Sequence, residues 1–306
     1  MERSQATVAR KITFCGKALH TGRVTTLEIN PAMADTGIVF KRTDSPDTSP
    51  IKASYNNIST TVLSTSIGEG RSSISTIEHL MAAFIGLDID NAFVTLDGPE
   101  VPILDGSSQG FVDGLMEVRK VQQNFAGKIM KVSKPFEYRA GDQFISVEPF
   151  EGSYFECAID FPWKVIGKQS IEYNHNLESF LEIADARTFC HADDVEVMKT
   201  KGLALGGSLD NAVVVSEQGV LNGGGLRSGN EFVKHKLLDM IGDLGLLGGP
   251  IQGLVKAYKP GHRLHKEFML AAMENGVFSE VTVSVDKARF FGKISSAFLP
   301  VTANYR

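Results

Sequence analysis

The segment of residues 231–243 constrains the fold of this chain most, because its pattern is that of one buried helix. His235, Asp239 and Asp243 recur every four positions, while phenylalanine, valine, leucine, methionine and isoleucine supply the apolar remainder. Residues four apart lie on the same face of an α-helix. Burial of an imidazole and two carboxylates costs free energy unless these groups are paired or used. The segment therefore predicts an internal helix that directs three polar side chains toward one place.

This spacing allows two interpretations. An imidazole and a carboxylate one turn apart can bind the same divalent cation, as on the zinc-binding helices of metallohydrolases. The same residues could instead form a hydrogen-bonded pair on a solvated face. Two ligands do not make a metal site, so the choice depends on whether the rest of the chain supplies a third.

The composition limits the class of protein. The length of 306 residues favours two domains, and the apolar fraction of 42% with a charged fraction of 22% is typical of a globular protein. A net charge of −5 without a Lys/Arg run argues against nucleic-acid binding. Cys15, Cys157 and Cys190 show no paired spacing, which fits a reducing compartment. No signal peptide or membrane-spanning apolar run is evident, so we expect a cytoplasmic protein without stable membrane insertion.

The order of the elements is repeated along the chain. Short β-type runs before residue 66 precede a helix over about 76–85, a strand over 91–96 and a helix over about 108–119. Strands recur between 134 and 173, followed by the helix of 231–247, a strand over 251–258 and a helix ending near 275. We interpret this as two α+β layer units, residues 1–126 and 127–306, whose His-bearing helices face each other across the interface.

The first unit supplies a candidate third ligand. His79 follows Glu78 at the start of an otherwise apolar helix, where the two side chains are close enough to serve one metal site. A carboxylate at a helix N-terminus tends to stay ionised, as a general base requires. The alternative is structural, because Ser75 and Glu78 also match a capping box.

His262 is a candidate acid. It lies in the turn after a buried strand, and Asp243, one turn beyond Asp239, could orient its imidazole and favour the charged form. A helix-capping or surface histidine is the alternative. His191 and His265 have no clear partner in the sequence, and His20 is ambiguous.

Six motifs in register then resemble one family over nearly the whole chain, the UDP-3-O-acyl-N-acetylglucosamine deacetylases of lipid A biosynthesis. The motifs are those of residues 74–83, 103–107, 186–189, 221–227, 230–244 and 259–262. The resemblance implies two similar domains, each a two-layer sandwich of a mainly antiparallel sheet and two helices. It also implies a zinc-dependent amidase, with Fe²⁺ possible, that hydrolyses the N-acetyl group of UDP-3-O-(3-hydroxyacyl)-N-acetylglucosamine in the committed step of the pathway.

The resemblance also implies a role for each matching residue. The metal ligands would be His79, His235 and Asp239, with Glu78 as general base and His262 as general acid. Asp243 would be the partner of the acid, and Thr188 would hold the oxyanion. The substrate positions would be Lys236, Phe189, Phe161 and Lys259, the last two near the nucleotide. Cys190 and His191 stand where many members have glycine followed by an apolar residue.

An insertion at about 190–213 would form a passage for the acyl chain, and the protein would be a monomer. The apolar residues of this segment could line such a passage or belong to an ordinary core; they are Val195, Val197, Met198, Leu203 and Leu205. Two other functions stay open: a non-enzymatic nucleotide-sugar or lipid-binding protein, and a metal amidase for another acylated substrate. The sequence does not determine the acyl-chain length, the physiological metal or the oligomeric state.

Overall fold

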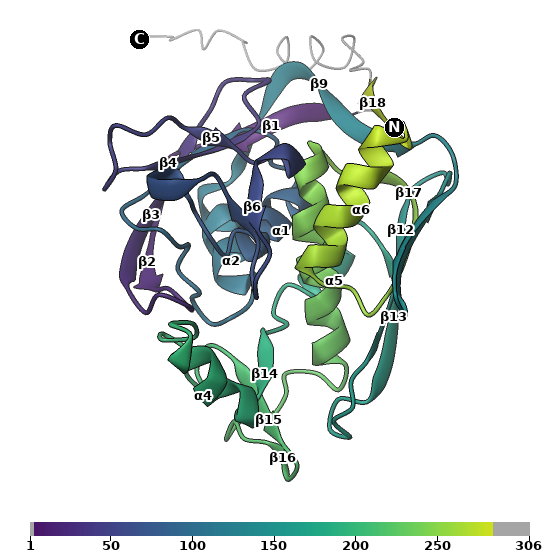
Figure 1. The fold of residues 1–306 in the computed structure, drawn as a ribbon. Coiled ribbons are helices and arrows are strands. Elements are labelled where there is room, and N and C mark those ends of the chain that lie inside the picture. The colour runs from purple at the N-terminus through teal and green to yellow at the C-terminus, as the bar shows by residue number, and fades with distance from the viewer. Residues whose placement is uncertain (1–2, 284–306) are drawn as a thin grey trace, which may run out of the picture.

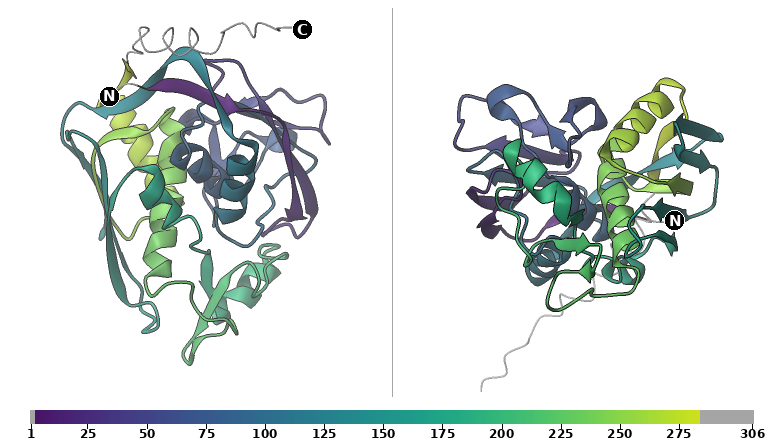
Figure 2. Two further views of the ribbon diagram at one scale, coloured as in Figure 1. Left: turned by 180° about the vertical axis from the view of Figure 1, so that it is seen from behind. Right: turned by 60° about the horizontal axis from the view of Figure 1, so that its bottom comes forward.

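The computed structural model describes residues 3–283, and its main body is built of two large sheets with helices between them (Figures 1 and 2). The first sheet comes from the N-terminal part of the chain and has five strands. In spatial order they are β2 (Ile12–Lys17), β3 (Val24–Pro31), β8 (Ala92–Leu96), β4 (Ile38–Arg42) and β5 (Ile51–Lys52). Neighbouring strands are antiparallel except β4 and β8, which are parallel. Alternate residues of β3, β4 and β8 are buried, as expected for strands with one face on a core.

The second sheet has eight strands and is also mixed. Its strands are β1 (Ser4–Val8), β9 (Lys120–Val132), β10 (Phe136–Ala140), β11 (Gln143–Glu148), β12 (Ser153–Asp160), β13 (Lys168–Asn174), β17 (Ile251–Tyr258) and β18 (Phe278–Val283). The central strand β17 pairs with β11 in antiparallel and with β12 and β9 in parallel orientation. The long strand β9 also pairs with β1 and β18, and it therefore joins the first residues of the described chain to its last strand.

Four helices fill the space between the sheets (Figure 2). They are α1 (Glu78–Gly86), α2 (Gln109–Val118), α5 (Glu231–Leu244) and α6 (His262–Glu274). Helices α1 and α2 belong to the part of the chain that forms the first sheet, whereas α5 and α6 pack on β12, β13, β10 and β11 of the second. Helix α5 also packs along α1, so the centre of the molecule is a contact between the helices that carry His79 and His235.

Helix α5 is buried because almost every position of it is needed on the inside. Twelve of its residues are buried, and Lys234 and Lys236 are the two that are not. The helix continues into a 3-10 turn, η3 (Gly245–Leu247), and ends where Gly248 takes the left-handed conformation, with φ 111°. Two sides of α5 thus face protein, one toward α1 and one toward the second sheet.

A small lobe projects beyond one end of α5, at the bottom of Figure 1. It contains β14 (Phe189–His191), α4 (Ala192–Thr200), β15 (Val213–Ser216) and β16 (Gly219–Val220), with β14, β15 and β16 forming a three-stranded sheet. The remaining short elements are η1 (Tyr55–Asn57), β6 (Ile58–Thr60), β7 (Ser66–Ile67), η2 (Gly70–Ser72) and α3 (Leu177–Leu181). Of these, β6 and β7 form a hairpin whose loop reaches the site described below.

The predicted α+β fold is confirmed, and most strand pairs are antiparallel. The predicted division after residue 126 falls inside β9, and it stays a prediction. Residues 284–306 of the second predicted domain lie outside the described residues. Within residues 3–283, no helix combines the length and the apolar character needed to cross a bilayer.

Candidate active site and metal centre

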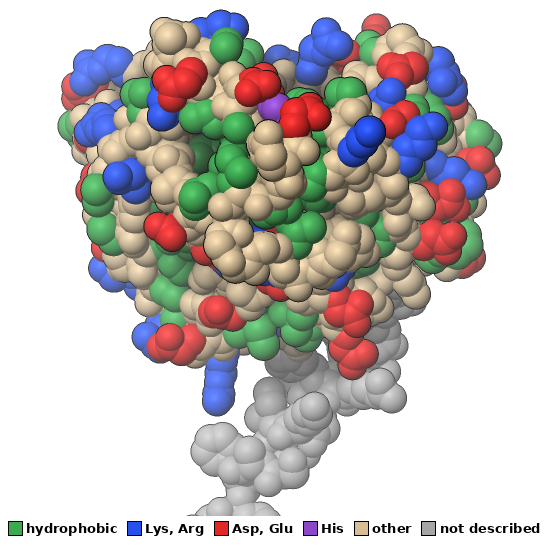
Figure 3. Space-filling view, turned by 90° about the horizontal axis from the view of Figure 1, so that it is seen from below, with side chains coloured by type: hydrophobic (Ala, Val, Ile, Leu, Met, Phe, Trp, Pro, Cys, Tyr) green, Lys and Arg blue, Asp and Glu red, His purple; other side chains and the backbone are tan. Residues whose placement is uncertain are grey.

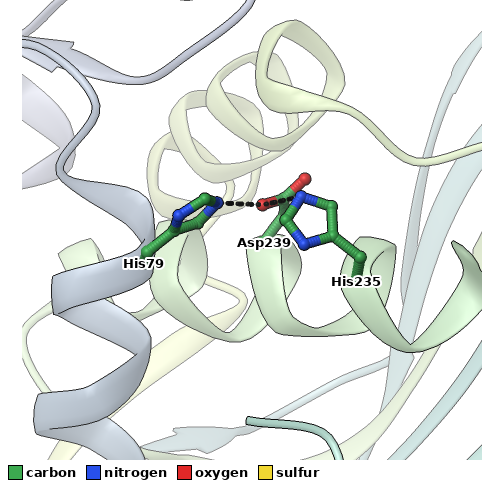
Figure 4. Close-up of side chains that lie close together, drawn as sticks. All are labelled: His79, His235 and Asp239. Atoms are coloured by element: carbon green, nitrogen blue, oxygen red, sulfur yellow. Dashed lines mark ion pairs between the residues drawn. The ribbon is translucent and has the colours of Figure 1, made fainter. Parts of the chain in front are cut away.

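Three potential metal ligands converge between α1 and α5. His79 comes from α1, whereas His235 and Asp239 lie one turn apart on α5 (Figure 4). Nε2 of His79 is 3.5 Å and Nε2 of His235 is 3.4 Å from the same carboxylate oxygen, Oδ1 of Asp239. The two imidazoles meet edge to face, with ring centroids 5.1 Å apart. The three donor atoms lie within 4.8 Å of one another, a spacing that could hold a metal ion.

The hydrogen bonds made by Asp239 and His235 leave one potential metal-ligand atom free on each side chain. Oδ1 of Asp239 is buried and has no hydrogen-bond partner among the described residues, while Oδ2 accepts from Nζ of Lys236 at 2.8 Å. Nδ1 of His235 lies 3.0 Å from the carbonyl oxygen of Ala186, which requires the proton on Nδ1 and leaves the Nε2 lone pair toward the site. A buried carboxylate oxygen without a donor is rare in proteins, and a cation would satisfy it.

The pKa values of His235 and Asp239 favour a neutral imidazole and an ionised carboxylate, the forms that bind metal ions. Burial lowers the pKa of His235 to about 3, against the opposing effect of Asp239, so its imidazole is neutral at neutral pH. Burial alone would raise the pKa of Asp239, but His235 and Lys236 outweigh it and hold that pKa well below the ordinary value. The interpretation of a solvated hydrogen-bonded pair is wrong, because His235 and Asp239 are each 1% exposed.

Glu78 is buried beside the triad. It is the first residue of α1, and its Oε2 accepts a hydrogen bond of 3.0 Å from the backbone N–H of Thr65. The capping-box interpretation is wrong, because Ile77 is the N-cap and no side-chain cap bond is made. Burial raises the pKa of Glu78 to about 6, with His262 and His79 opposing the rise. The carboxyl therefore changes charge near neutral pH.

His262 faces Glu78 across the site. Its Nε2 is 3.9 Å from Oε1 of Glu78 and 3.9 Å from Oδ2 of Asp239, while its Nδ1 is 2.7 Å from Oδ2 of Asp243. Burial alone would lower the pKa of His262, but Asp243 outweighs it and raises that pKa to about 9. The interpretation as a surface or capping residue is wrong, since only 10% of the side chain is exposed and the N-cap of α6 is Gly261.

Two further residues of this site were not predicted from the sequence. Nδ1 of His265 lies 2.6 Å from Oδ2 of Asp243, and the hydroxyl of Thr65 donates to Oδ1 of Asp243 at 2.6 Å. For His265 a signal existed, since it follows His262 by three positions on a helix and so lies near it. For Thr65 there was none, because 178 residues separate it from Asp243.

The site opens into two adjoining cavities. The first, of about 350 Å³, is lined by Glu78, His79, His235, Asp239 and His262 among others. The second, of about 780 Å³, extends under the small lobe and is mostly apolar. Both share the lining residues Leu19, Leu63, Thr188, Phe189 and Lys236. Figure 3 views the molecule from the side of this lobe, where hydrophobic side chains gather around a hollow.

The remaining predicted site residues divide between the two cavities. Thr188, Phe189 and Lys236 line both, and Phe161 lines the apolar one. Lys259 lines neither; its Nζ pairs with Asp142 at 2.7 Å and with Asp160 at 3.7 Å. Of the apolar residues in the lobe, four line the second cavity and one does not; the four are Val195, Val197, Met198 and Leu203, and the fifth is Leu205.

Comparison with known proteins identifies the family of this chain. Residues 5–274 match the family model described as LpxC: UDP-3-O-acyl N-acetylglycosamine deacetylase. The chain belongs to this family. It is similar to the UDP-3-O-acyl-N-acetylglucosamine deacetylase of Acidithiobacillus ferrooxidans, with 44% identity over 272 residues, 88% of this chain and 90% of the relative. The same-named proteins of Geobacter sp. strain M21 and Brucella melitensis biotype 2 are 45% and 40% identical, over 87% and 92% of this chain and 87% and 99% of theirs.

Membership of the deacetylase family decides between the classes of function left open by the sequence. The chain is a hydrolase that acts on an amide, not a binding protein built on the same fold. The family and the converging histidine and aspartate ligands together indicate a metal-dependent deacetylase.

Proposed function

We propose that the residues around the first cavity catalyse hydrolysis of the N-acetyl group of UDP-3-O-(3-hydroxyacyl)-N-acetylglucosamine. The products are the free amine and acetate, and the reaction belongs to lipid A biosynthesis. Membership of the deacetylase family supports the reaction. The single observation that carries the chemistry is the convergence, in one buried place, of a ligand triad, a carboxyl with a raised pKa and an imidazole with a raised pKa. Enzymatic hydrolysis of an amide can use a Lewis acid that polarises the carbonyl, a base that takes a proton from water and an acid that protonates the leaving amine.

His79, His235 and Asp239 are proposed to hold zinc. Two imidazoles and one carboxylate are nitrogen and oxygen donors that suit Zn²⁺ in a catalytic site, and Fe²⁺ accepts the same set. When bound, the metal polarises the acetamide carbonyl and lowers the pKa of water. Lys236, whose own pKa is raised by Asp239 against the opposing effect of burial, keeps Oδ2 of Asp239 occupied and so leaves Oδ1 for the metal.

Glu78 is proposed as the general base. Its pKa of about 6 makes it largely ionised at neutral pH, yet still basic enough to accept a proton from the attacking water. The hydrogen bond from the backbone of Thr65 holds Oε2, which leaves Oε1 toward His262 and the cavity. The carboxylate is thus held in one orientation before substrate enters.

His262 is proposed as the general acid, with Asp243 as its partner. Since a carboxylate can only accept, the short contact places a proton on Nδ1 of His262 and directs Nε2 into the site. With a pKa of about 9, the imidazole carries a second proton on Nε2 at neutral pH. That proton is available to the amine nitrogen as the amide bond breaks.

Thr188 and Lys236 are proposed to contact the reacting end of the substrate. Both line the two cavities, so they lie where the sugar head would meet the acyl passage. The Thr188 hydroxyl would donate to the developing oxyanion, and the Lys236 ammonium would bind the polar head. Phe189, which has the Lys236 Nζ 5.5 Å from its ring centroid, would be the apolar wall between head and chain.

The second cavity is proposed to take the acyl chain, with the segment at about 190–213 as its outer wall. Its apolar lining and its continuity with the first cavity support this assignment. Phe161, in the wall of the second cavity, and Lys259, outside both cavities, are proposed to lie near the nucleotide. We further propose a cytoplasmic monomer of two domains, residues 1–126 and 127–306, with the metal between them.

Acetate release from the UDP-linked acylated substrate, with and without a chelator, tests the proposal. We expect stoichiometric acetate and free amine, loss of turnover with the chelator and recovery on addition of Zn²⁺ or Fe²⁺. Turnover that survives complete removal of metal would overturn the proposed metal role. Acetate release only from a differently acylated substrate would keep the chemistry and overturn the substrate.

A further inference from the structure

Asp243 accepts hydrogen bonds from three side chains, two on helix α6 and one in the loop between β6 and β7. Oδ2 lies 2.7 Å from Nδ1 of His262 and 2.6 Å from Nδ1 of His265, and Oδ1 accepts from the Thr65 hydroxyl at 2.6 Å. Asp243 is 1% and His265 0% exposed. Charge-assisted hydrogen bonds of this length in a buried place are among the stronger ones in proteins.

We infer that His265 is a positioning residue for the proton donor: it fixes the carboxylate of Asp243, which in turn fixes the ring of His262. The inference rests on the proposed roles of His262 and Asp243. His265 does not touch the cavity, and its side chain is not among the lining residues of either one. Its effect on the reaction therefore passes through Asp243.

The geometry explains why two imidazoles share one oxygen. His262 and His265 are three residues apart, so they rise from the same side of the first turns of α6. Their rings are nearly perpendicular, at 89°, and both direct Nδ1 to Oδ2 of Asp243. His265 is anchored in the core beside Leu264 and Phe268, whereas His262 borders the cavity. The buried ring thus holds the carboxylate at the position from which it orients the ring that faces substrate.

The cost of burying His265 also argues for a specific use. Its Nε2 is buried and has no hydrogen-bond partner among the described residues. An unpaired polar atom in a core costs free energy, so a residue needed only for packing would be better replaced by an apolar one of similar size. What the imidazole supplies that leucine cannot is the single Nδ1–H donor to Asp243.

Asp243, His262 and His265 also lie close enough together to be considered as ligands of a second metal ion. The two nitrogen–oxygen separations of 2.6 and 2.7 Å are those of direct hydrogen bonds, which leave no room for an ion between the atoms. We therefore assign the group to hydrogen bonding.

Two variants of His265 separate a donor from a space-filling residue. His265→Asn keeps an N–H near the position of Nδ1, whereas His265→Leu fills similar space without a donor. For His265→Leu we expect kcat to fall roughly tenfold with KM changed by less than about twofold, and for His265→Asn we expect most of that loss to be restored. Equal losses of kcat in both variants, or none in His265→Leu, would overturn the inference.

His262→Gln, assayed in parallel, separates failure of this inference from failure of the proposed function. If His262→Gln keeps full kcat, the proposed acid role fails, and with it the basis of the inference. If His262→Gln loses kcat while His265→Leu does not, only the inference is overturned. Zinc content should be the same in wild type and both His265 variants, and loss of one metal equivalent in His265→Leu would instead assign the group to metal binding.

A spectroscopic measurement covers the case in which His265→Leu does not fold. In wild-type protein with ¹⁵N-labelled histidine, His265 should show the proton on Nδ1, protected from exchange with solvent. A proton on Nε2 alone would overturn the inference, because Nδ1 could then not donate to Asp243.

Discussion

Gly242 of α5 lies directly against the carbonyl oxygen of Glu78 in α1, so closely that a Cβ on Gly242 would be 2.1 Å from that oxygen. Such a separation is impossible for a real side chain. The two helices therefore approach as closely as they do only because residue 242 is glycine. Since α1 carries His79 and α5 carries His235 and Asp239, this contact also sets the distance across which a metal would be bound.

The first prediction concerns this contact. Gly242→Ala should push α1 and α5 apart and lower the free energy of unfolding by about 1–3 kcal/mol, the usual cost of overpacking a core. Metal affinity should fall as well, because His79 moves away from Asp239. Urea unfolding and zinc titration measure the two effects. Gly223→Ala, in an exposed loop with no atom within 4 Å of the added Cβ, is the matched control and should change neither.

The second prediction separates a base from a ligand. Glu78→Gln should lower kcat by roughly 10²–10⁴-fold, because the amide cannot accept the proton from water, and should leave the metal content unchanged. Metal analysis of the purified variant beside an acetate assay gives both values. If the variant loses its metal instead, Glu78 is a ligand and its assigned role is mistaken.

The third prediction is a bell-shaped dependence of kcat/KM on pH. The base works only when ionised, so activity should rise as pH increases through the Glu78 pKa of about 6. The acid works only when protonated, so activity should fall as pH increases through the His262 pKa of about 9. His262→Gln should remove the alkaline limb and move the acid limb to higher pH, because His262 no longer lowers the pKa of Glu78. A wild-type profile that does not fall below the Glu78 pKa and above the His262 pKa would contradict paired acid and base roles.

The fourth prediction tests the apolar cavity. Met198→Trp, on the cavity side of α4, should lower kcat/KM for the acylated substrate by roughly tenfold, because it fills space that the chain would occupy. Substrates with shorter acyl chains should be affected less. Glu196→Trp, on the same helix but exposed and outside the lining, should behave as wild type. Equal effects of both substitutions on long and short chains would place the acyl chain elsewhere.

Local patterns in the sequence predicted those parts of the site that one helix determines. The spacing of His235, Asp239 and Asp243 identified a helix with one polar face, and the structure has these three residues buried on α5. The approach of His79 depends on packing between segments more than 150 residues apart, about which periodicity carries no information. The family resemblance, built from several motifs in register, supplied that pairing.

The sequence patterns did not predict contacts between different elements of the fold. Glu78 matches a capping box by spacing, yet its partner is the backbone of Thr65 in the loop of the β6–β7 hairpin. His265 stands among charged residues in the sequence, but the amphipathic helix α6 turns it inward toward Asp243. Strand β9 runs through the predicted boundary because its two ends pair with strands from opposite ends of the described chain. For Glu78 and His265, tertiary packing outweighed a local signal.

The central claim is that His79, His235 and Asp239 hold the one metal ion on which deacetylation depends. It is tested most directly by titrating metal-free protein with Zn²⁺ while acetate release from the UDP-linked acylated substrate is measured, for wild type and for His79→Ala and Asp239→Ala. The account predicts that wild-type activity returns in full at one equivalent of zinc per chain and that neither variant recovers it. Full activity of the metal-free protein, or recovery of either variant at one equivalent, would contradict the account.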